Sequence, residues 1–292
     1  MLIVGCGDVG LRVARLLRPG VSVRALTSSA QRVRELRSAG ILPLLGDLDD
    51  PAALRRLAGV ATRVLHLAPP QAEGWKDRRT RALAQALQRR TVPSVLVYGS
   101  TSGVYGNCAG ALVSEARPAR ADTPRARRRA DAEQVVRFFA RTVPTRASIL
   151  RIPGIYAADR IGGTPRARLE KHTPVLRSED DVFTNHIHAD DLARACVAAL
   201  WRGRAQRIYN VNDDSCLKMG DYFDLAADLY GLPRPPRVAR GTAERELPLM
   251  LLGFMSESRQ LDNRRMKQEL GVALRYPTVH TGLLASMRPA LP

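Results

Sequence analysis

Four arginines stand close together in the segment TPRARRRADAEQVV, in a stretch that predicts the start of a helix: Arg125, Arg127, Arg128 and Arg129. Guanidinium groups pair strongly with phosphate and carboxylate oxygens. Two kinds of partner suit such a cluster, the backbone of a nucleic acid or a small anionic substrate. Binding of a small anionic substrate requires a fold that places this helix beside a binding site, so the remaining sequence is needed to distinguish the two kinds of partner.

A second pattern with chemical meaning opens the chain. In LIVGCGDVGLRVARLL, three glycines follow an apolar run with G-x-G-x-x-G spacing and lead into an amphipathic helix. Gly5 permits a tight turn, Gly7 lets the backbone approach a pyrophosphate, and Gly10 lets the helix pack against the strand. The free N–H groups of the helix start then face the phosphates. The pattern predicts dinucleotide binding, with Asp8 and Val9 inside the loop among the contact residues.

The end of the second predicted strand bears on which dinucleotide is bound. An NAD site usually carries an acidic residue about 20 positions after the glycine loop, where it binds the ribose 2′-hydroxyl. This chain reads RALTSSAQR at that place, so Thr27, Ser28 and Arg32 are the polar groups near the ribose. Hydroxyls and a guanidinium suit a 2′-phosphate, so NADP is favoured, with NAD as the alternative. Arg32 as a merely solvated helix residue is the competing interpretation.

Alternating strands and helices must position these groups. Short apolar runs bounded by turn residues predict strands at 2–4, 21–26, 41–45, 64–67, 95–98 and 148–152, with helical periodicity between them. This alternation predicts an α/β fold, a doubly wound Rossmann-type parallel sheet. We expect a dinucleotide-binding domain over 1–156 and a smaller substrate lobe over 157–292, with 187–212 returning to the sheet. The segment HADDLARACVAALW predicts a helix capped by Asp190 or Asp191.

Composition limits the partners. With 46 basic and 28 acidic residues the net charge is +18, which by itself suggests a polyanion. The arginines are spread along the whole chain, however, and only 5% of residues are aromatic, so the cluster lacks a stacking platform. The sequence therefore argues against nucleic acid as the main partner.

Several other site classes are not expected. The longest apolar run, 247–255, is too short to span a bilayer and indicates core or a homodimer surface. Four distant cysteines and the lack of a signal segment favour a reducing cytoplasmic setting. His186 and His188 share one face of a predicted strand, but no third ligand clusters with them, so no metal site is expected.

Further motifs follow the glycine loop in order: GDLDDPAAL, VLHLAPP, YGSTSGVYG, LRIPGIYA, HIHADDLARA and YNVNDD. With them the chain resembles the atypical extended short-chain dehydrogenase/reductases, the NAD(P)-dependent epimerase/dehydratase family, over nearly its full length. The resemblance implies that Asp47, with Leu48, lies by the adenine and that Ala68 and Pro69 line the ribose on the nicotinamide side. It also implies that Thr101 polarises a substrate carbonyl.

The family's acid/base pair is missing from its expected place. Its chemistry uses a tyrosine and a lysine in a Y-x-x-x-K pair, and alignment on Glu133 puts Arg125 in the tyrosine position and Arg129 in the lysine position. No tyrosine lies between Tyr105 and Tyr156, so a shifted alignment does not restore the pair. Arginine stays protonated and cannot shuttle a proton as a phenol does, although Arg129 retains the ability to bind ribose hydroxyls.

Three hypotheses remain open. If the protein is an oxidoreductase or epimerase/dehydratase, Tyr105, Tyr156 or Asp77 has to move the proton. Alternatively, the protein binds NAD(P) without turnover, as a redox sensor or regulator. In the third hypothesis the arginine-rich helix binds an anionic substrate such as a nucleotide sugar. The expected substrate contacts are Thr101, Tyr105, Tyr156, Asn185 and His186.

Overall fold

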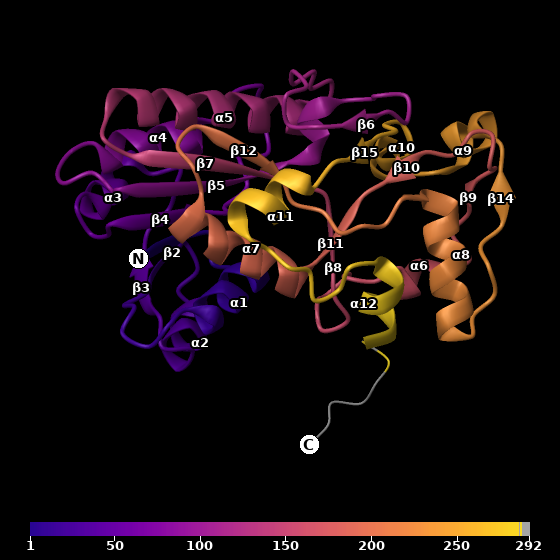
Figure 1. Cartoon of the computed structure of the whole chain (residues 1–292), viewed down its shortest axis with the longest axis horizontal. Helices are drawn as coiled ribbons and strands as arrows, with labels where there is room; N and C mark the ends of the chain where they lie inside the picture. The colour runs from indigo at the N-terminus through magenta and orange to yellow at the C-terminus, as the bar shows by residue number, and fades with distance from the viewer. Residues whose placement is uncertain (286, 288–292) are drawn as a thin grey trace.

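A seven-stranded parallel sheet organises the N-terminal two-thirds of the chain (Figure 1). The computed structural model describes residues 1–285 and residue 287. From one edge to the other, the strands are β12 (Arg207–Asn210), β7 (Arg146–Ile152), β5 (Val95–Thr101), β4 (Arg63–His66), β1 (Leu2–Val4), β2 (Arg24–Thr27) and β3 (Leu42–Leu45). Every neighbouring pair is parallel.

Helices cover both faces of this sheet, which is why its central strands are apolar throughout rather than alternating. Leu2, Ile3 and Val4 of β1 are fully buried. Figure 1 shows α4 and α5 on one face and α1 and α7 on the other. The helical elements of this part are α1 (Asp8–Leu16), α2 (Arg32–Ser38), α3 (Pro51–Leu54), α4 (Arg78–Leu87), α5 (Pro124–Thr142) and α7 (Ala189–Arg202), with 3-10 turns at Arg55–Leu57 and Ser102–Tyr105.

The predicted fold class is confirmed: this is a Rossmann-type α/β sheet with the strand order 3-2-1-4-5 continued by two further strands. The order reverses beside β1, so the carboxyl ends of β1 and β4 flank the crevice in which such sheets bind ligands. Within the segment 187–212, β12 pairs with β7 at the sheet edge.

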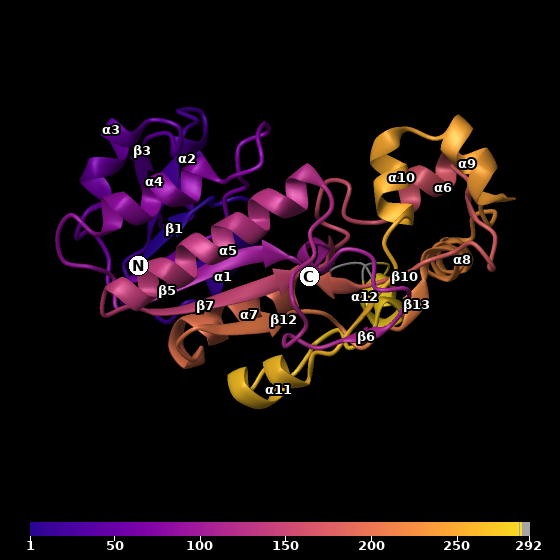
Figure 2. The same cartoon turned by 90° about the horizontal axis from the view of Figure 1, so that it is seen from above.

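Most of the remaining elements form a smaller lobe beside the carboxyl ends of the strands (Figure 2), whereas α11 (Arg264–Leu270) packs against α7 and β12 of the sheet domain. The smaller lobe has its own buried core, to which α8 contributes Tyr222 and Phe223. Met255 of the apolar run 247–255 is buried in this core, whereas the side chains of Leu249, Met250 and Phe254 lie outside the described part of the structure. The elements after β7 are β8 (Gly154–Tyr156), α6 (Arg166–Glu170), β9 (Val175–Leu176), β10 (Phe183–Thr184), β11 (His186–His188), β13 (Leu217–Lys218), α8 (Met219–Tyr230), β14 (Arg237–Val238), α9 (Arg240–Glu246), α10 (Leu249–Met255), β15 (Gln260–Leu261), α11 (Arg264–Leu270) and α12 (Val279–Ala285), and β15 pairs with the short β6 (Leu112–Val113).

A buried ion pair fixes α5, the helix with the arginine cluster, against the sheet. Arg151 of β7 donates from Nη2 to Glu133 Oε2 at 2.7 Å, and both side chains are almost fully buried. Ser100 of β5 donates to the other carboxylate oxygen at 2.6 Å. Because a buried charge needs a close partner, these contacts set the position of α5 relative to the ends of β5 and β7.

Candidate functional site

The three glycines of the N-terminal loop differ in what surrounds them. A Cβ on Gly5 would lie 2.3 Å from the backbone nitrogen of Ala68, and Gly5 has φ +85, so only glycine fits there. A Cβ on Gly10 would approach Cys6 Sγ at 3.2 Å and Ile3 Cγ2 at 3.3 Å, in agreement with tight packing of α1 on β1. At Gly7 a Cβ would meet nothing within 4 Å. Protein packing therefore does not explain glycine at position 7, while access for a ligand does.

The start of α1 has no side-chain cap, a feature that it shares with α2, α6, α8, α9, α10 and α11 but not with α4, α5 and α7. Asp77, Thr123 and His188 each cap their helices by accepting a hydrogen bond from a backbone N–H. Gly7 caps α1 without any side-chain hydrogen bond. The first N–H groups of a helix have no acceptor within the helix, so those of α1 are available to a ligand as well as to water. The loop fits the pyrophosphate of a dinucleotide, which such donors bind.

The side chains predicted near the adenosine end lie around this loop. Arg32 donates from Nη1 to the carbonyl of Cys6 at 2.7 Å and pairs with Glu35 at 3.0 Å, so its guanidinium lies against the glycine loop. Thr27 is engaged in a turn, in which its Oγ1 accepts from the Ser29 N–H at 3.3 Å, and Ser28 is exposed. The strand β2 ends at Thr27 without an acidic residue.

Two of the predicted loop residues have further roles. Val9 is buried in the core between α1 and the sheet. Asp8 is bound on both carboxylate oxygens, by Arg12 Nε at 3.1 Å and by Arg160 Nη1 at 2.7 Å. The Asp8 side chain is therefore occupied by cations in this structure.

The residues predicted on the other side of the crevice follow β3 and β4. Asp47 is exposed and accepts the Asp49 N–H at 2.9 Å, and Leu48 is buried. Ala68 donates its N–H to the Val4 carbonyl at 3.0 Å, which brings it directly beside Gly5, and Pro69 is exposed. The glycine loop, Ala68 and Pro69 therefore lie close together at the carboxyl ends of β1 and β4.

Arg129 lies across the same edge. Its Nη1 donates to the Gly99 carbonyl at 2.8 Å, to the Tyr98 hydroxyl at 3.0 Å and to the Ala68 carbonyl at 3.4 Å. Burial raises the pKa of Tyr98 to about 12, and its side chain is inaccessible, so Tyr98 does not replace the missing catalytic tyrosine. The hydrogen bonds of Arg129 all run from Nη1, so its Nε and Nη2 take no part in them.

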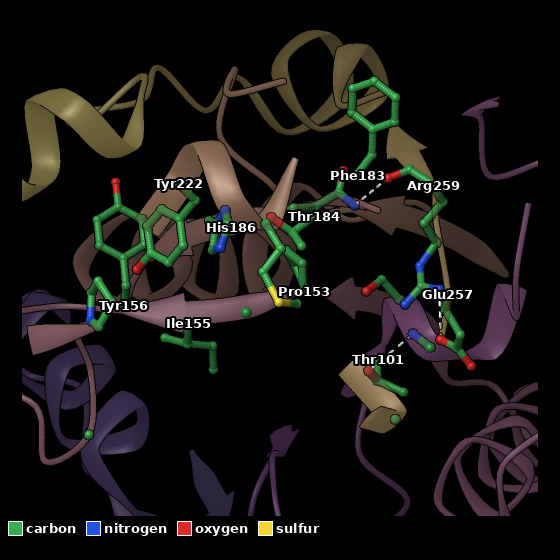
Figure 3. Close-up of a pocket in the computed structure, with 18 of the residues that line it drawn as sticks. Thr101, Pro153, Ile155, Tyr156, Phe183, Thr184, His186, Tyr222, Glu257 and Arg259 are labelled. Carbon is green, nitrogen blue, oxygen red and sulfur yellow. Dashed lines mark hydrogen bonds and ion pairs between the residues drawn. The ribbon is translucent and has the colours of Figure 1, made fainter. Parts of the chain in front are cut away.

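A cavity of about 690 Å³ separates the end of β5 from the smaller lobe (Figure 3). Tyr156, Tyr222 and His186 are grouped at one end, and Thr101, Glu257 and Arg259 lie toward the other. The charged side chains of the wall are Arg125, Arg160, Arg168, Arg259 and Glu257. Cations therefore outnumber anions around the cavity.

Two of these cations are without a partner. The Nε and Nη2 atoms of Arg168 are buried and have no hydrogen-bond acceptor among the described residues, and the guanidinium stacks 4.3 Å from the centre of the Phe223 ring. Burial lowers the pKa of Arg168. Arg125 makes no hydrogen bond or ion pair within the described part of the chain; desolvation and the neighbouring Arg129 and Arg128 lower its pKa. Arg259, by contrast, is paired with Glu257 at 2.7 Å.

Four of the five predicted substrate contacts line this cavity: Thr101, Tyr156, Asn185 and His186. Thr101 Oγ1 accepts the Gly103 N–H at 3.2 Å, which leaves its own proton for a ligand. Burial lowers the pKa of His186 to about 4, so its ring is neutral at physiological pH. Asn185 bonds Arg259 and Leu261 through its amide group.

Three expectations need correction. Tyr105 does not line the cavity, because its side chain is buried and its hydroxyl donates to Asn210 Oδ1 at 2.7 Å. Asp77 is the buried cap of α4 and accepts from the N–H and hydroxyl of Thr80; a carboxylate held in this way does not reach the cavity. The cap of α7 is His188, whose Nδ1 accepts the Asp190 N–H at 3.2 Å, and not Asp190 or Asp191.

The sequence did not predict the arginines that the smaller lobe contributes to the cavity wall. Arg160 and Arg168 come from the loop and short helix after β8, and Tyr222 from α8. No motif marked the segment RIGGTPRAR among so many scattered arginines. Its position directly after the GIY strand was the only available signal.

In the described part of the chain, no group of three or more His, Cys, Asp or Glu side chains is arranged to bind a metal ion. The helices in that part are also too short or too polar for any of them to cross a bilayer.

Comparison with known proteins identifies the class. The sequence model described as "NAD dependent epimerase/dehydratase family" matches residues 1–212, and the chain belongs to this family. A solved structure of a functionally unknown conserved protein from Silicibacter pomeroyi is similar over 98% of this chain and 96% of its own, with 30% identity and a TM-score of 0.81. No significant match was found among curated proteins.

Two enzymes of known activity share the fold. The UDP-glucose 4-epimerase from Thermotoga maritima, solved with UDP-glucose, is 18% identical with a TM-score of 0.79, over 98% of this chain and 96% of its own. The dTDP-glucose 4,6-dehydratase from Streptomyces venezuelae, solved with NAD, is 22% identical with a TM-score of 0.75, over 98% of this chain and 94% of its own. At these identities the likeness establishes the fold.

Proposed function

We propose that the protein is an NAD(P)-dependent oxidoreductase or epimerase/dehydratase of the atypical extended short-chain class, with a preference for NADP and an anionic substrate. Nucleotide sugars are the candidate substrates, and UDP-glucose and a dTDP sugar are the compounds named for two structural neighbours. The observation that carries the proposal is the pair of unpartnered guanidiniums, Arg125 and Arg168, in the wall of one cavity with Thr101. The buried Nε and Nη2 atoms of Arg168 lack an acceptor, which is costly in the free protein, and an anionic substrate would supply it. Arg125 is exposed, so water solvates it in the free protein and it would add attraction for the same anion.

The placement of the arginine cluster supports an anion further. The helix α5 begins at Pro124 and has no acidic residue in its first turn. Cations at a helix N-terminus oppose the helix dipole, whereas bound anions are stabilised there. A phosphate or carboxylate close to Arg125 would therefore gain from both the guanidinium and the helix.

The glycine loop supports dinucleotide binding. Gly7 leaves open space, the start of α1 leaves N–H donors, and Ala68 with Arg129 borders the same crevice. The preference for NADP depends on Arg32 and on the lack of an acid at the end of β2. Glu35 binds Arg32 in this structure, so a 2′-phosphate would compete with that exposed ion pair.

The bound dinucleotide would accept or supply the hydride. Thr101 would donate its hydroxyl proton in a hydrogen bond to the substrate oxygen, and Arg125 would stabilise negative charge on the substrate without transferring a proton. Tyr156 is the phenol of the original candidates that lines the cavity. Burial and the nearby Asp213 raise its pKa, and its hydroxyl donates to the Thr278 carbonyl at 3.2 Å, so Tyr156 would orient the substrate by a hydrogen bond rather than give up its proton.

A second candidate function is a non-catalytic NAD(P)-binding redox sensor. It is favoured by the arginine in the tyrosine position and by the raised pKa values of Tyr98, Tyr156 and Tyr222, because no phenol of this group is activated. Nucleic-acid binding is the remaining alternative, and its support is the net charge of +18. Four free thiols agree with the proposed cytoplasmic setting.

Fluorescence titration with NADPH and NADH tests the cofactor. We expect NADPH to bind more tightly and Gly7→Asp to abolish binding, because the new carboxylate would occupy the space for the pyrophosphate. Equal binding by Gly7→Asp would refute the loop assignment, and tighter binding of NADH would overturn the NADP preference. RNA or DNA binding at physiological ionic strength that NADP leaves unchanged would favour the nucleic-acid alternative.

Turnover is tested by screening nucleotide sugars and small ketones for NADPH oxidation. Thr101→Ala should lower kcat at least about tenfold, because it removes the hydroxyl expected to polarise the substrate. Dinucleotide binding with no turnover on any compound would favour the sensor.

Association of two copies is a separate proposal, for which Phe138, 60% exposed on α5, is a candidate contact. A monomer in sedimentation velocity at micromolar concentration would contradict it.

A further inference from the structure

Among the described residues that line the cavity, Arg160 is the one whose side chain hydrogen-bonds a residue of α1. It lies in the loop after β8, and its Nη1 donates to Asp8 Oδ2 at 2.7 Å. Asp8 directly follows Gly7, in the first turn of α1. The guanidinium is therefore held next to the N–H groups that are available for a pyrophosphate.

We propose that Arg160 is a further dinucleotide-binding residue, which exchanges Asp8 for the bound pyrophosphate and draws the loop 157–163 toward the glycine loop. This inference rests on the proposed binding of NADP or NAD. It adds a residue from the smaller lobe to a site otherwise built from the Rossmann sheet.

The ion pairs around Asp8 allow such an exchange. Arg12 contacts Asp8 at 3.1 Å, Asp159 at 2.6 Å and Asp190 at 2.5 Å, and its side chain is only 9% exposed. Arg160 and Asp8 are 30% and 31% exposed. If Arg160 leaves, Asp8 keeps Arg12 as its partner, so no carboxylate is left unpaired.

The local charge also favours the exchange. Three carboxylates, on Asp8, Asp159 and Asp190, face two guanidiniums at the start of α1. A pyrophosphate adds two more negative charges close to Asp8. Of the two guanidiniums, Arg160 is the more exposed one, so it is the one that can reorient toward a phosphate at little cost in desolvation.

The loop around Arg160 is built to move as one piece. Ala157 donates its N–H to the Gly163 carbonyl at 3.1 Å, and Gly163 donates to the Arg160 carbonyl at 2.9 Å. Gly163, Thr164 and Pro165 continue from this loop into the cavity wall. A shift of Arg160 would thus carry the wall with it. Ile161 at the loop tip is fully exposed, and movement toward the glycine loop offers this apolar side chain a surface to cover.

The test compares variants whose effects should have opposite signs. ADP-ribose and NADPH are titrated calorimetrically into the wild type, Arg160→Gln, Arg160→Lys, Asp8→Asn and Arg15→Gln. Arg15 is an exposed residue near the far end of α1, so Arg15→Gln removes the same charge from the same region. Arg160→Gln should weaken ADP-ribose about tenfold, the loss of one charge-assisted hydrogen bond. Arg160→Lys should recover part of this loss, and Arg15→Gln should stay within about twofold.

Asp8→Asn separates ligand binding from a structural tether. If Arg160 binds the pyrophosphate, freeing it from Asp8 should tighten ADP-ribose binding, opposite to Arg160→Gln, and by more than in the Arg160→Gln background, where only the loss of the Asp8 charge acts. If the pair only ties the loop down, both variants weaken binding equally, and the inference is wrong. An affinity of Arg160→Gln within twofold of the wild type would also overturn it. Failure of the wild type to bind ADP-ribose and NADPH would instead refute the proposed function and this inference with it.

Hydrogen exchange gives a second readout that does not depend on affinity. At saturating ADP-ribose, amide exchange in residues 157–163 should slow in the wild type and in Arg15→Gln but not in Arg160→Gln. AMP, which lacks the pyrophosphate, should leave these amides unchanged in all proteins. Protection of the loop in Arg160→Gln equal to the wild type contradicts the role of Arg160.

Discussion

Arg129 Nη1 lies 3.0 Å from the hydroxyl of Tyr98, a buried tyrosine at the centre of the sheet. Arg129 is therefore anchored to β5 through Tyr98 and Gly99 and to the segment after β4 through Ala68. An arginine with five donors can hold these acceptors and still contact a ribose hydroxyl.

This anchoring predicts a double effect of Arg129→Met. The variant should lose about 1–3 kcal/mol of stability, because buried acceptors lose a charged donor, and should bind NADPH several-fold more weakly. Chemical denaturation and NADPH titration measure the two effects. Arg141→Met, an exposed residue in the last turn of the same helix, is the control. A variant that loses stability but binds NADPH normally would remove Arg129 from the cofactor site.

The glycine loop predicts a contrast between two alanine substitutions. Gly5→Ala should prevent folding or cost several kcal/mol, because its Cβ would lie 2.3 Å from the Ala68 backbone nitrogen. Gly7→Ala should change the stability by less than about 1 kcal/mol, since its Cβ meets nothing within 4 Å, yet should weaken NADPH binding. Thermal unfolding with and without NADPH distinguishes the two. Normal NADPH affinity in Gly7→Ala would show that the open space there is not used by the ligand.

Replacement of Arg168 should have opposite effects on stability and on substrate binding. Arg168→Met should raise the free energy of unfolding by about 1 kcal/mol or more, because a methionine keeps the packing on Phe223 and removes a buried charge without an acceptor. The same change should weaken UDP-glucose binding about tenfold if this guanidinium binds the anion. Arg234→Met, which removes an exposed arginine paired with Asp228, should alter neither quantity appreciably. Reduced stability of Arg168→Met would argue that the guanidinium is satisfied in solution.

Asp213 predicts a pH dependence of stability. Burial raises the pKa of Asp213 to about 7, so the native state keeps this proton at pH values where the unfolded chain, with a pKa near 3.8, has released it. Stability from this group is present at low pH and is lost as the pH rises toward 7. Asp213→Asn should therefore gain roughly 2–4 kcal/mol over the wild type at pH 8 and much less at pH 4.

The buried histidines act in the opposite direction. Burial lowers the pKa of His186 to about 4 and that of His66 to about 3, so their contribution is lost as the pH falls below about 6.5. His66 and His186 are present in the wild type and in Asp213→Asn alike. The difference in unfolding free energy between these two proteins at each pH therefore reports on Asp213 alone. A difference that does not change between pH 4 and pH 8 would show that Asp213 titrates normally.

The sequence by itself determined the fold class and the glycine loop. Both follow from local patterns: the apolar run of β1 marks a buried strand, and the G-x-G-x-x-G spacing marks Gly5 as the turn residue. The close approach of Ala68, which also excludes a Cβ at Gly5, is a tertiary contact. The placement of Arg125 and Arg129 in the family's tyrosine and lysine positions stays a prediction, which depends on alignment through Glu133 of the same helix.

Only the tertiary structure decided which side chains face the cavity. Tyr105 and Tyr156 are equally good candidates in the sequence, but the first donates to Asn210 in the core and the second lines the cavity. Arg160 and Arg168 could not be distinguished from the many other arginines, because what sets them apart is a long-range property. Contact with Asp8, 152 residues earlier in the chain, and burial without an acceptor arise only when the loop after β8 folds against distant elements.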